Sequence, residues 1–364
     1  MNAKETTDLQ KIEYDIIHFE ALGPEAEYLR EEILRAIEAG ELPLGHNYLI
    51  TPLNVQDFLK AHPGLHLPLI ISTKTHSVLP EAYLRQDGKS VVTRSAGYDH
   101  FEHLAETVNI ASLREYCVNA VAQTAIKFLY ATAGELNHYT ENARTFERKN
   151  SDAFMELGEH KVLTVYGVGK IGKKIYELAQ ANGLTVQGVD IRQHLLTDIY
   201  GNTVHFVSKN EAIKTSDILV NAMNLTKNRD NSFYNVGYFS KEYLSKGKTG
   251  FIFINVTRGE IAPESGLLDL YESGKIKGIA LDVFTNESEF SRFLNGTAAS
   301  GADISAAGKL VRKALDRTGN VYVQPHQGFN SDIAAKIKAI EAIRHVISWY
   351  KNDGRRFDEQ LPYY

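Results

Sequence analysis

The chain has 364 residues, of which 43% are hydrophobic and 23% charged, and its formal net charge is −5; these values suit a globular protein of about two domains and give no reason to expect a nucleic-acid partner. The single cysteine, Cys117, excludes an internal disulfide and favours a reducing compartment. A polar segment over residues 1–10 does not resemble a secretory signal, and no apolar run approaches the roughly 18 residues of a membrane span, so we expect a cytoplasmic protein.

The N-terminal third alternates short strand and helix patterns. Apolar runs predict strands over residues 12–17, 67–71 and 90–93. Helical periodicity covers residues 25–39, with Pro24 near its start and Gly40 at its end. Residues 118–136 predict a long apolar helix rich in small residues, which is typical of a helix that packs against other elements.

The same rhythm continues over residues 161–325. Strands are predicted at 162–166, 185–189, 204–207, 218–222, 251–255, 279–283 and 321–323, with helices between most of them. A further helix is expected over residues 306–316, and the last one over residues 332–352. Strands alternating with helices indicate a parallel sheet covered on both faces, so the fold class is α/β.

The first motif with chemical content is a glycine-rich turn between a strand and a helix. Gly167, Gly169 and Gly172 form a G-x-G-x-x-G pattern whose other residues are Val168, Lys170 and Ile171. The first glycine allows a tight turn, the second lets a pyrophosphate approach the backbone, and the third lets the helix pack on the sheet. The helix N-terminus then presents free N–H groups to the phosphates.

An acidic residue, Asp190, ends the next predicted strand. A carboxylate at that point accepts hydrogen bonds from ribose hydroxyls and repels a 2′-phosphate, so NAD is favoured over NADP. Arg192 weakens this preference for NAD, because a nearby guanidinium can accommodate the 2′-phosphate of NADP. A methyltransferase is the main alternative among nucleotide-binding proteins.

Three ionisable residues follow predicted strands further along the chain: Arg258, Glu287 and His326. Since ligands bind at the carboxyl ends of parallel strands, we expect them at one rim of the sheet. Such a set suits the reduction of a 2-oxo acid by hydride transfer. Arg258 can hold the substrate carboxylate or carbonyl, His326 can protonate the carbonyl oxygen, and Glu287 can orient His326 and favour its charged form.

These motifs give the chain a family resemblance. It resembles the D-isomer-specific 2-hydroxyacid dehydrogenases, and most of all their D-lactate dehydrogenase branch. Residues 255–259 match the family pattern N-x-x-R-G, residues 258–284 follow its signature nearly throughout, and Pro325 with His326 match its Pro-His pair. Residues 93–100 are similar to the substrate-domain loop of the family.

The resemblance implies the organisation of the whole chain. A doubly wound NAD-binding Rossmann domain, residues 116–326, is inserted into a smaller flavodoxin-like substrate domain, residues 1–115 plus 327–364, with hinges near 114–116 and 327–330 and an active site in the cleft. It also implies a homodimer formed through the Rossmann domain. Thr257 and Asp282 are assigned to the cofactor, and the substrate-binding residues are Ala96, Gly97, Tyr98 and Tyr116, of which Ala96 and Gly97 hold the substrate carboxylate by their backbone N–H groups.

Other functions stay open at this point. A dehydrogenase-like corepressor that senses NAD would retain the same residues, and hydroxypyruvate or glyoxylate reduction is a further member reaction. Formate or phosphite oxidation is less favoured, because formate enzymes usually have Gln at the position of Glu287. We expect no metal site: His100 and His103 have a metal-like spacing, but no carboxylate or cysteine cluster supports them.

Overall fold

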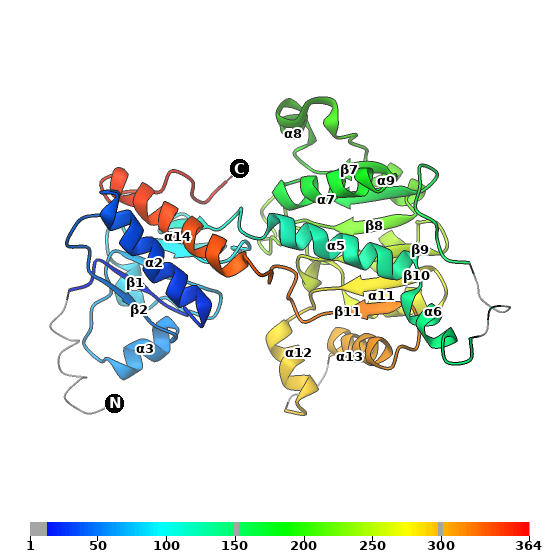
Figure 1. Cartoon of the computed structure of the whole chain (residues 1–364), viewed down its shortest axis with the longest axis horizontal. Helices are drawn as coiled ribbons and strands as arrows, with labels where there is room; N and C mark the ends of the chain where they lie inside the picture. Colours follow the sequence, from blue (N-terminus) through cyan, green and yellow to red (C-terminus); the bar gives the residue numbers. More distant parts are fainter. Residues whose placement is uncertain (1–12, 147, 149–152, 298–300, 364) are drawn as a thin grey trace. The chain divides into compact units, whose positions relative to one another are not determined.

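A computed structural model describes the chain except for residues 1–12, 147, 149–152, 298–300 and 364. The first residue of the strand predicted over residues 12–17 therefore lies outside the described residues, and so does the whole segment 1–10. The described chain divides into two compact units (Figure 1). The first unit contains residues up to Tyr116 together with Asn330 onward, and the second contains residues 117–329. No described helix is long and apolar enough to cross a bilayer.

The first unit is built on a five-stranded parallel sheet. Its strand order is β2-β1-β3-β4-β5, the 2-1-3-4-5 order of flavodoxin-like folds. The strands are β1 (Ile16–His18), β2 (Tyr48–Ile50), β3 (Ile70–Thr73), β4 (Ser90–Thr93) and β5 (Asn109–Ser112). Because both faces of the sheet are covered, all residues of β1, β3 and β4 are buried, the polar ones at their ends included.

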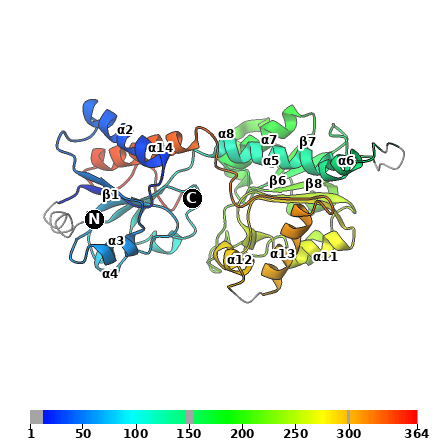
Figure 2. The ribbon, with the colours of Figure 1, turned by 60° about the horizontal axis from the view of Figure 1, so that its bottom comes forward.

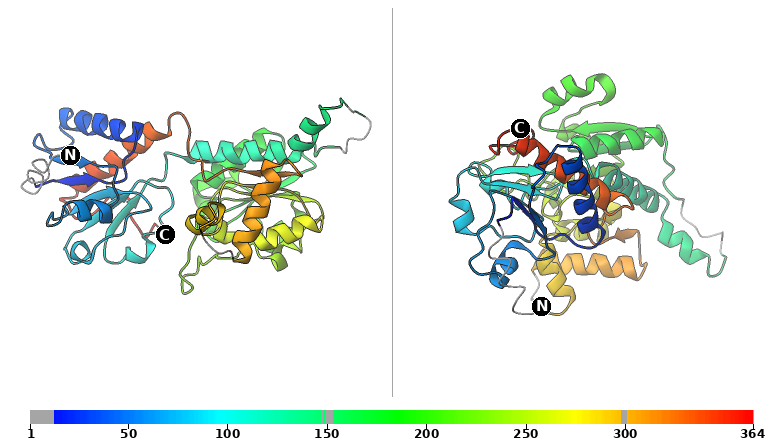
Figure 3. Two further views of the ribbon diagram at one scale, coloured as in Figure 1. Left: turned by 90° about the horizontal axis from the view of Figure 1, so that it is seen from below. Right: turned by 60° about the vertical axis from the view of Figure 1, so that its left-hand side comes forward.

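Two helices from opposite ends of the sequence lie side by side on one face of this sheet: α2 (Pro24–Glu38) and α14 (Ala334–Lys351) (Figures 1 and 3). The other face has α3 (Val55–Ala61) and α4 (Glu81–Leu84), and a short 3-10 turn, η1, covers Glu102–Leu104 (Figure 2). Pro24 starts α2 with its backbone already near helical geometry, and the Asn54 side chain caps α3 by accepting the N–H of Asp57.

The second unit is built on a six-stranded parallel sheet, in the order β11-β10-β9-β8-β6-β7. Its strands are β6 (Val162–Tyr166), β7 (Thr185–Val189), β8 (Ile218–Asn221), β9 (Phe251–Asn255), β10 (Ile276–Leu281) and β11 (Val321–Val323). After β6 the chain first adds β7 on one side and then crosses to place β8 on the other. The carboxyl ends of β6 and β8 therefore form the switch point at which such folds bind ligands.

Helices cover both faces of the second sheet: α5 and α7 pack together on one face, and α11 and α13 on the other (Figure 2). The helices of this unit are α5 (Val118–Ala133), α6 (Leu136–Asn142), α7 (Lys170–Ala181), α8 (Gln193–Tyr200), α9 (Lys209–Thr215), α10 (Lys241–Leu244), α11 (Glu264–Glu272), α12 (Glu287–Leu294) and α13 (Ala302–Leu315), with 3-10 turns η2 (Gly201–Thr203) and η3 (Gly259–Ile261). The predicted α/β class with two Rossmann-like parallel sheets is confirmed.

Several element boundaries differ from the prediction. The strand predicted over residues 204–207 is wrong: only one bridge forms there, between Gly188 and Phe206, because η2 ends just before it and Ser208 already caps α9. The bridge lies beside β7, at the position that a further strand occupies in a Rossmann fold. β10 begins at Ile276, earlier than predicted, and ends at Leu281, so Asp282 and Val283 lie beyond it. β2, α3 and β5 were not predicted.

Candidate active site

The glycine-rich turn follows β6 and begins α7, as its spacing predicts. Gly167 has φ +85°, and a Cβ there would lie 2.7 Å from the Cα of Met223. A Cβ on Gly172 would lie 1.9 Å from the carbonyl oxygen of Gly167, so the helix can approach the turn only without a side chain. Gly169, the N-cap of α7, has nothing within 4 Å of its Cβ position. The turn is therefore closely packed at two glycines and open at the third, which fits the approach of a pyrophosphate to the helix N-terminus.

Asp190 follows β7 and faces this turn. Its Oδ2 accepts the N–H of Val168 at 2.8 Å, and its Oδ1 accepts the N–H of Arg192 at 2.9 Å. The Arg192 Nε lies 3.4 Å from the same Oδ1. A carboxylate has about four lone-pair positions, so capacity for ribose hydroxyls remains. Asp190 thus also holds the shape of the glycine turn, a second task that its position in the motif does not reveal.

Arg258 is presented by a turn that two buried amides shape. Asn255, the last residue of β9, donates its Nδ2 to the carbonyl of Arg258 and accepts the N–H of Thr257. Asn221, the last residue of β8, donates to Asn255 Oδ1 and to Thr257 Oγ1, both at 2.9 Å. The half-buried Arg258 guanidinium donates to the carbonyl of Thr257 at 2.8 Å. Sequence reasoning missed Asn221; the available signal was an amide ending a wholly apolar strand.

Asp282 follows β10 and organises the loop after β11. Its carboxylate is buried and accepts hydrogen bonds from Gln324 Nε2 at 2.6 Å and from the N–H groups of Gln327 and Gly328 at 2.9 and 3.0 Å. Burial raises the pKa of Asp282, and these hydrogen bonds oppose that rise. The backbone carbonyl of Asp282 also accepts the N–H of His326 at 2.6 Å. Asp282 therefore fixes the backbone at the histidine and at the two residues after it.

His326 and Glu287 meet at the rim of the sheet. His326 Nδ1 lies 2.8 Å from Glu287 Oε2, and both side chains are half-buried. His326 has φ +51°, a left-handed conformation that is uncommon for a residue with a side chain and is frequent at functional sites. The carboxylate engages Nδ1, and no described residue forms a hydrogen bond with the other ring nitrogen, Nε2.

Three neighbouring strands, β9, β10 and β11, thus deliver Arg258, then Asp282 and Glu287, then His326 beyond their carboxyl ends. Their loops also touch: a Cβ on Gly259 would lie 2.0 Å from the carbonyl carbon of Phe284, so the turn after β9 packs backbone to backbone on the loop before Glu287. Hydrogen bonds join Asp282, Glu287 and His326 into one cluster, and Arg258 stands on the adjoining turn.

The predicted substrate-binding residues lie in the first unit. Ala96 and Gly97 belong to the loop after β4, which starts at the buried Arg94. The Tyr98 ring packs against Tyr363 with centroids 5.5 Å apart. Tyr116, the last residue of the unit before the chain enters the second, donates its backbone N–H to Glu341 Oε2 at 2.9 Å.

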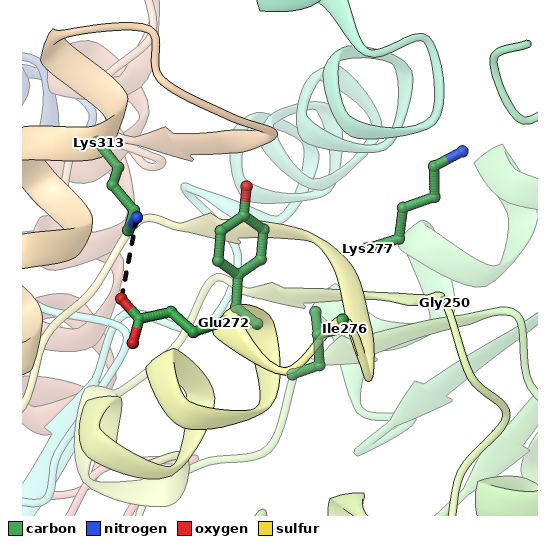
Figure 4. Close-up of a pocket in the computed structure, with 7 residues that line it drawn as sticks. Gly250, Glu272, Ile276, Lys277 and Lys313 are labelled. Atoms are coloured by element: carbon green, nitrogen blue, oxygen red, sulfur yellow. Dashed lines mark ion pairs between the residues drawn. The ribbon is translucent and has the colours of Figure 1, made fainter. Parts of the chain in front are cut away.

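A surface cavity of about 580 Å³ lies at the opposite edge of the second sheet, where β9 and β10 begin (Figure 4). Its two lysines are paired: Lys313 lies 3.9 Å from Glu272, and Lys277 lies 2.6 Å from Glu135. It is lined by Gly250, Tyr271, Glu272, Gly274, Ile276, Lys277 and Lys313. Since ligands of parallel sheets bind at the carboxyl edge, the edge with Arg258, Glu287 and His326 is the candidate site, and this cavity lies away from it.

Comparison with known proteins gives the same family from several directions. Residues 126–328 match the model of the D-isomer specific 2-hydroxyacid dehydrogenase, NAD binding domain. A D-lactate dehydrogenase of Treponema pallidum is 26% identical over 216 residues, which are 57% of this chain and 61% of that protein. An aromatic 2-oxoacid reductase of Clostridium sporogenes is 29% identical over 255 residues, 68% of this chain and 71% of that protein.

The fold also matches solved structures. The D-lactate dehydrogenase from Aquifex aeolicus, complexed with NAD and lactic acid, superposes with a TM-score of 0.72 at 20% identity, over 93% of this chain and 96% of that one. The family match covers more than half of the chain, and the glycine turn with Asp190 fits a dinucleotide. The chain belongs to the D-isomer-specific 2-hydroxyacid dehydrogenase family, and its cofactor is NAD.

Proposed function

We propose that the protein reduces a small 2-oxo acid, with pyruvate as the first candidate, to the D-2-hydroxy acid at the expense of NADH. The observation that supports this most is the hydrogen bond of 2.8 Å between His326 Nδ1 and Glu287 Oε2, on the rim next to the Arg258 turn. The second unit would bind the cofactor and the first unit the substrate.

When bound, NADH supplies a hydride from C4 of its nicotinamide ring. For the protein, the N-terminus of α7 at Gly169 would hold the pyrophosphate, and Asp190 would accept hydrogen bonds from the ribose hydroxyls. Thr257 and Asp282, which stand at the same carboxyl edge, would contact the nicotinamide end. The backbone of Val168, Lys170 and Ile171 completes the turn.

His326 is the proposed general acid. As C2 of the substrate accepts the hydride, the carbonyl oxygen gains negative charge, and Nε2 of a protonated His326 donates a proton to it. The bond to Nδ1 orients the ring, and the Glu287 carboxylate stabilises the charged imidazolium before the transfer. The neutral imidazole then regains a proton from solvent, and in the oxidation direction it acts as the base.

Arg258 is the proposed electrophile and anchor. Its planar guanidinium can hold the substrate carboxylate and draw electron density from the carbonyl, so that hydride addition becomes easier. We further propose that the backbone N–H groups of Ala96 and Gly97 bind the carboxylate and that Tyr98 and Tyr116 contact the substrate. The protein would act as a homodimer, which light scattering of the purified chain tests.

The choice of substrate rests on the mixture of relatives, one named for D-lactate and another for aromatic 2-oxo acids. The test is a panel of pyruvate, hydroxypyruvate, glyoxylate and phenylpyruvate with NADH and with NADPH, followed by chiral analysis of the product. We expect the highest kcat/KM with pyruvate and NADH and a D-configured product. A higher value with phenylpyruvate would move the proposal to the aromatic reductases, and an NADPH preference would refute the assignment of Asp190.

A further inference from the structure

A buried carboxyl group lies beneath the loop that leads to Glu287. Glu264, the first residue of α11, is 1% exposed. Its Oε1 accepts the N–H of Thr285 at 2.7 Å. Its Oε2 and the Thr285 Oγ1 are both buried, and neither forms a hydrogen bond of standard geometry among the described residues, although the Thr285 side chain is near enough to oppose the rise in the pKa of Glu264. Two buried polar atoms without partners are rare, and each calls for an explanation.

The loop that Glu264 holds leads to Glu287 and also contacts the turn of Arg258. Residues 283–286 connect Asp282 to Glu287, whose Oε1 accepts the N–H of Phe284 at 3.3 Å. A Cβ on Gly259 would lie 2.1 Å from the nitrogen of Thr285, so the same loop contacts the turn that presents Arg258. The hydrogen bond from the Thr285 N–H to Glu264 therefore holds a segment that contacts the Arg258 turn and leads directly to Glu287.

The charges around Glu264 do not compensate its own. Among the described residues, no Lys, Arg or His forms an ion pair with it. Asp303 of α13 is the charged group that acts on it, and Asp303 accepts hydrogen bonds from the N–H and the hydroxyl of Ser265 at 3.1 and 2.5 Å. Asp282 and Glu287 flank the loop, and the hydrogen bonds of their carboxylates go to other groups than Glu264. Burial is the main cause that raises the pKa of Glu264 to about 7, so charged and neutral forms coexist near neutrality.

We propose that Glu264 is a positioning residue for the reaction: by accepting the Thr285 N–H it fixes the loop between Arg258 and Glu287, and it holds that loop most firmly when it is ionised. A carboxylate accepts a hydrogen bond more strongly than a neutral carboxyl group does. The loop is therefore held less firmly when Oε2 carries a proton. This inference rests on the proposed function, because it concerns the placement of Glu287 and Arg258.

The kinetic test compares Glu264→Gln, Glu264→Leu and a control, Glu260→Gln, in which a more exposed carboxylate of the neighbouring η3 is neutralised. The pH dependence that comes from the rest of the site is shared by all variants, so each kcat is divided by that of Glu264→Gln at the same pH. This ratio should rise around pH 7 for wild type and for Glu260→Gln, and Glu264→Gln itself should stay active, because its amide oxygen still accepts the Thr285 N–H. Glu264→Leu should lose about tenfold or more in kcat at every pH, with the Kd for NADH unchanged. A ratio for wild type that does not rise around pH 7, or an unaltered kcat in Glu264→Leu, would overturn the assignment.

A second measurement does not require turnover. Folded Glu264 keeps its proton up to about pH 7, whereas an ordinary glutamate loses it near 4.5. Because the folded pKa is raised, the stability that this group contributes is present at acid pH and is lost as the pH rises through 7. The Tm of Glu264→Gln minus that of wild type should therefore increase from about pH 5 to pH 7 and stay constant at higher pH. No increase, in a chain that turns over 2-oxo acids, refutes the role of Glu264; an increase in a chain that reduces none refutes the proposed function instead.

Discussion

Glu287 Oε2 and His326 Nδ1 lie 2.8 Å apart although 38 residues separate them in sequence, and each stands on a loop that another group fixes. The Phe284 N–H holds the other oxygen of Glu287, and the backbone carbonyl of Asp282 accepts the N–H of His326. Among the described residues the imidazole is therefore held at Nδ1 alone, which leaves Nε2 for the proposed proton transfer.

Replacing His326 with Ala removes the proposed proton donor. We expect kcat for 2-oxo acid reduction to fall by about 10²–10⁴-fold, the usual contribution of a general acid, while the Kd for NADH stays unchanged. Stopped-flow and steady-state measurements of NADH oxidation check this. The control His103→Ala alters an exposed histidine of the first unit and should keep wild-type turnover. Near-normal activity of His326→Ala would end the proposed mechanism.

Replacing Glu287 with Gln keeps the shape of the side chain but removes its charge. The protonated imidazole then loses its charge partner, and we expect kcat to fall by about 10–100-fold, the value of one hydrogen bond between charged groups. Glu289→Gln on the same helix is the matched control, since that carboxylate bonds only to Asn286 among the described residues. Equal kcat values for the two variants would show that Glu287 does not act on His326.

Two alanine substitutions in the glycine turn should separate folding from cofactor binding. Gly172→Ala places a methyl group against the Gly167 carbonyl, so it should destabilise the second unit by about 1–3 kcal/mol. Gly169→Ala meets open space and has an ordinary negative φ, so the Tm should not change. Its methyl group would occupy the approach of the pyrophosphate, and we expect the Kd for NADH to rise about tenfold or more, about 1.4 kcal/mol. Calorimetry and NADH fluorescence titration distinguish the two effects, and equal behaviour of the variants would contradict this interpretation of the turn.

Glu341 of α14 should be a main determinant of the stability of the first unit. Its buried carboxylate accepts the N–H groups of three successive residues, Arg114, Glu115 and Tyr116. Glu341→Ala leaves these donors without their acceptor, and we expect a loss of about 2–4 kcal/mol in the free energy of unfolding. Lys336→Ala, at an exposed position of the same helix, should cost little.

The pH dependence of this effect has a definite sign. Burial raises the pKa of Glu341 against the opposing effect of the three N–H groups. The contribution of its titration to stability is therefore present at acid pH and is lost as the pH rises through the folded pKa. Glu341→Gln should lack this dependence, and scanning calorimetry from pH 4 to 8 measures it; a parallel pH dependence in wild type and variant would contradict it.

Four strands of the second unit were predictable from sequence because their pattern is local. Residues 162–166, 185–189, 251–255 and 321–323 have the predicted bounds, since β-branched and aromatic residues predominate in them. β2 was missed because none of its three residues is fully buried. β11 is equally short, but its two valines flank a tyrosine and follow the turn residues Gly319 and Asn320. The strand expected at 204–207 failed because it has one neighbour and lies between a turn and a helix cap.

The residues of the candidate site also differ in whether the sequence could predict them. The glycine turn and the residues after strands could be found from order along the chain, because parallel strands bring their carboxyl ends to one edge. Glu264 and Glu341 could not, since each is a buried polar residue whose partners lie far away in sequence. For Asn221 the amide at the end of an apolar strand was a signal, but it does not identify Asn255 and Thr257 as the partners. A single polar residue inside an apolar stretch has no periodicity that reports its partner. The roles of Arg258, Glu287 and His326 stay predictions for the experiments above.

The pairing of α2 with α14 sets an order for biosynthesis. The second unit is one uninterrupted stretch of polypeptide and can complete its fold on the ribosome. The first unit cannot: its α2 lacks its neighbour, Ser90 lacks the Trp349 indole, and the backbone at 114–116 lacks Glu341 until the last helix has been translated. The unit whose strands are synthesised first is thus completed last.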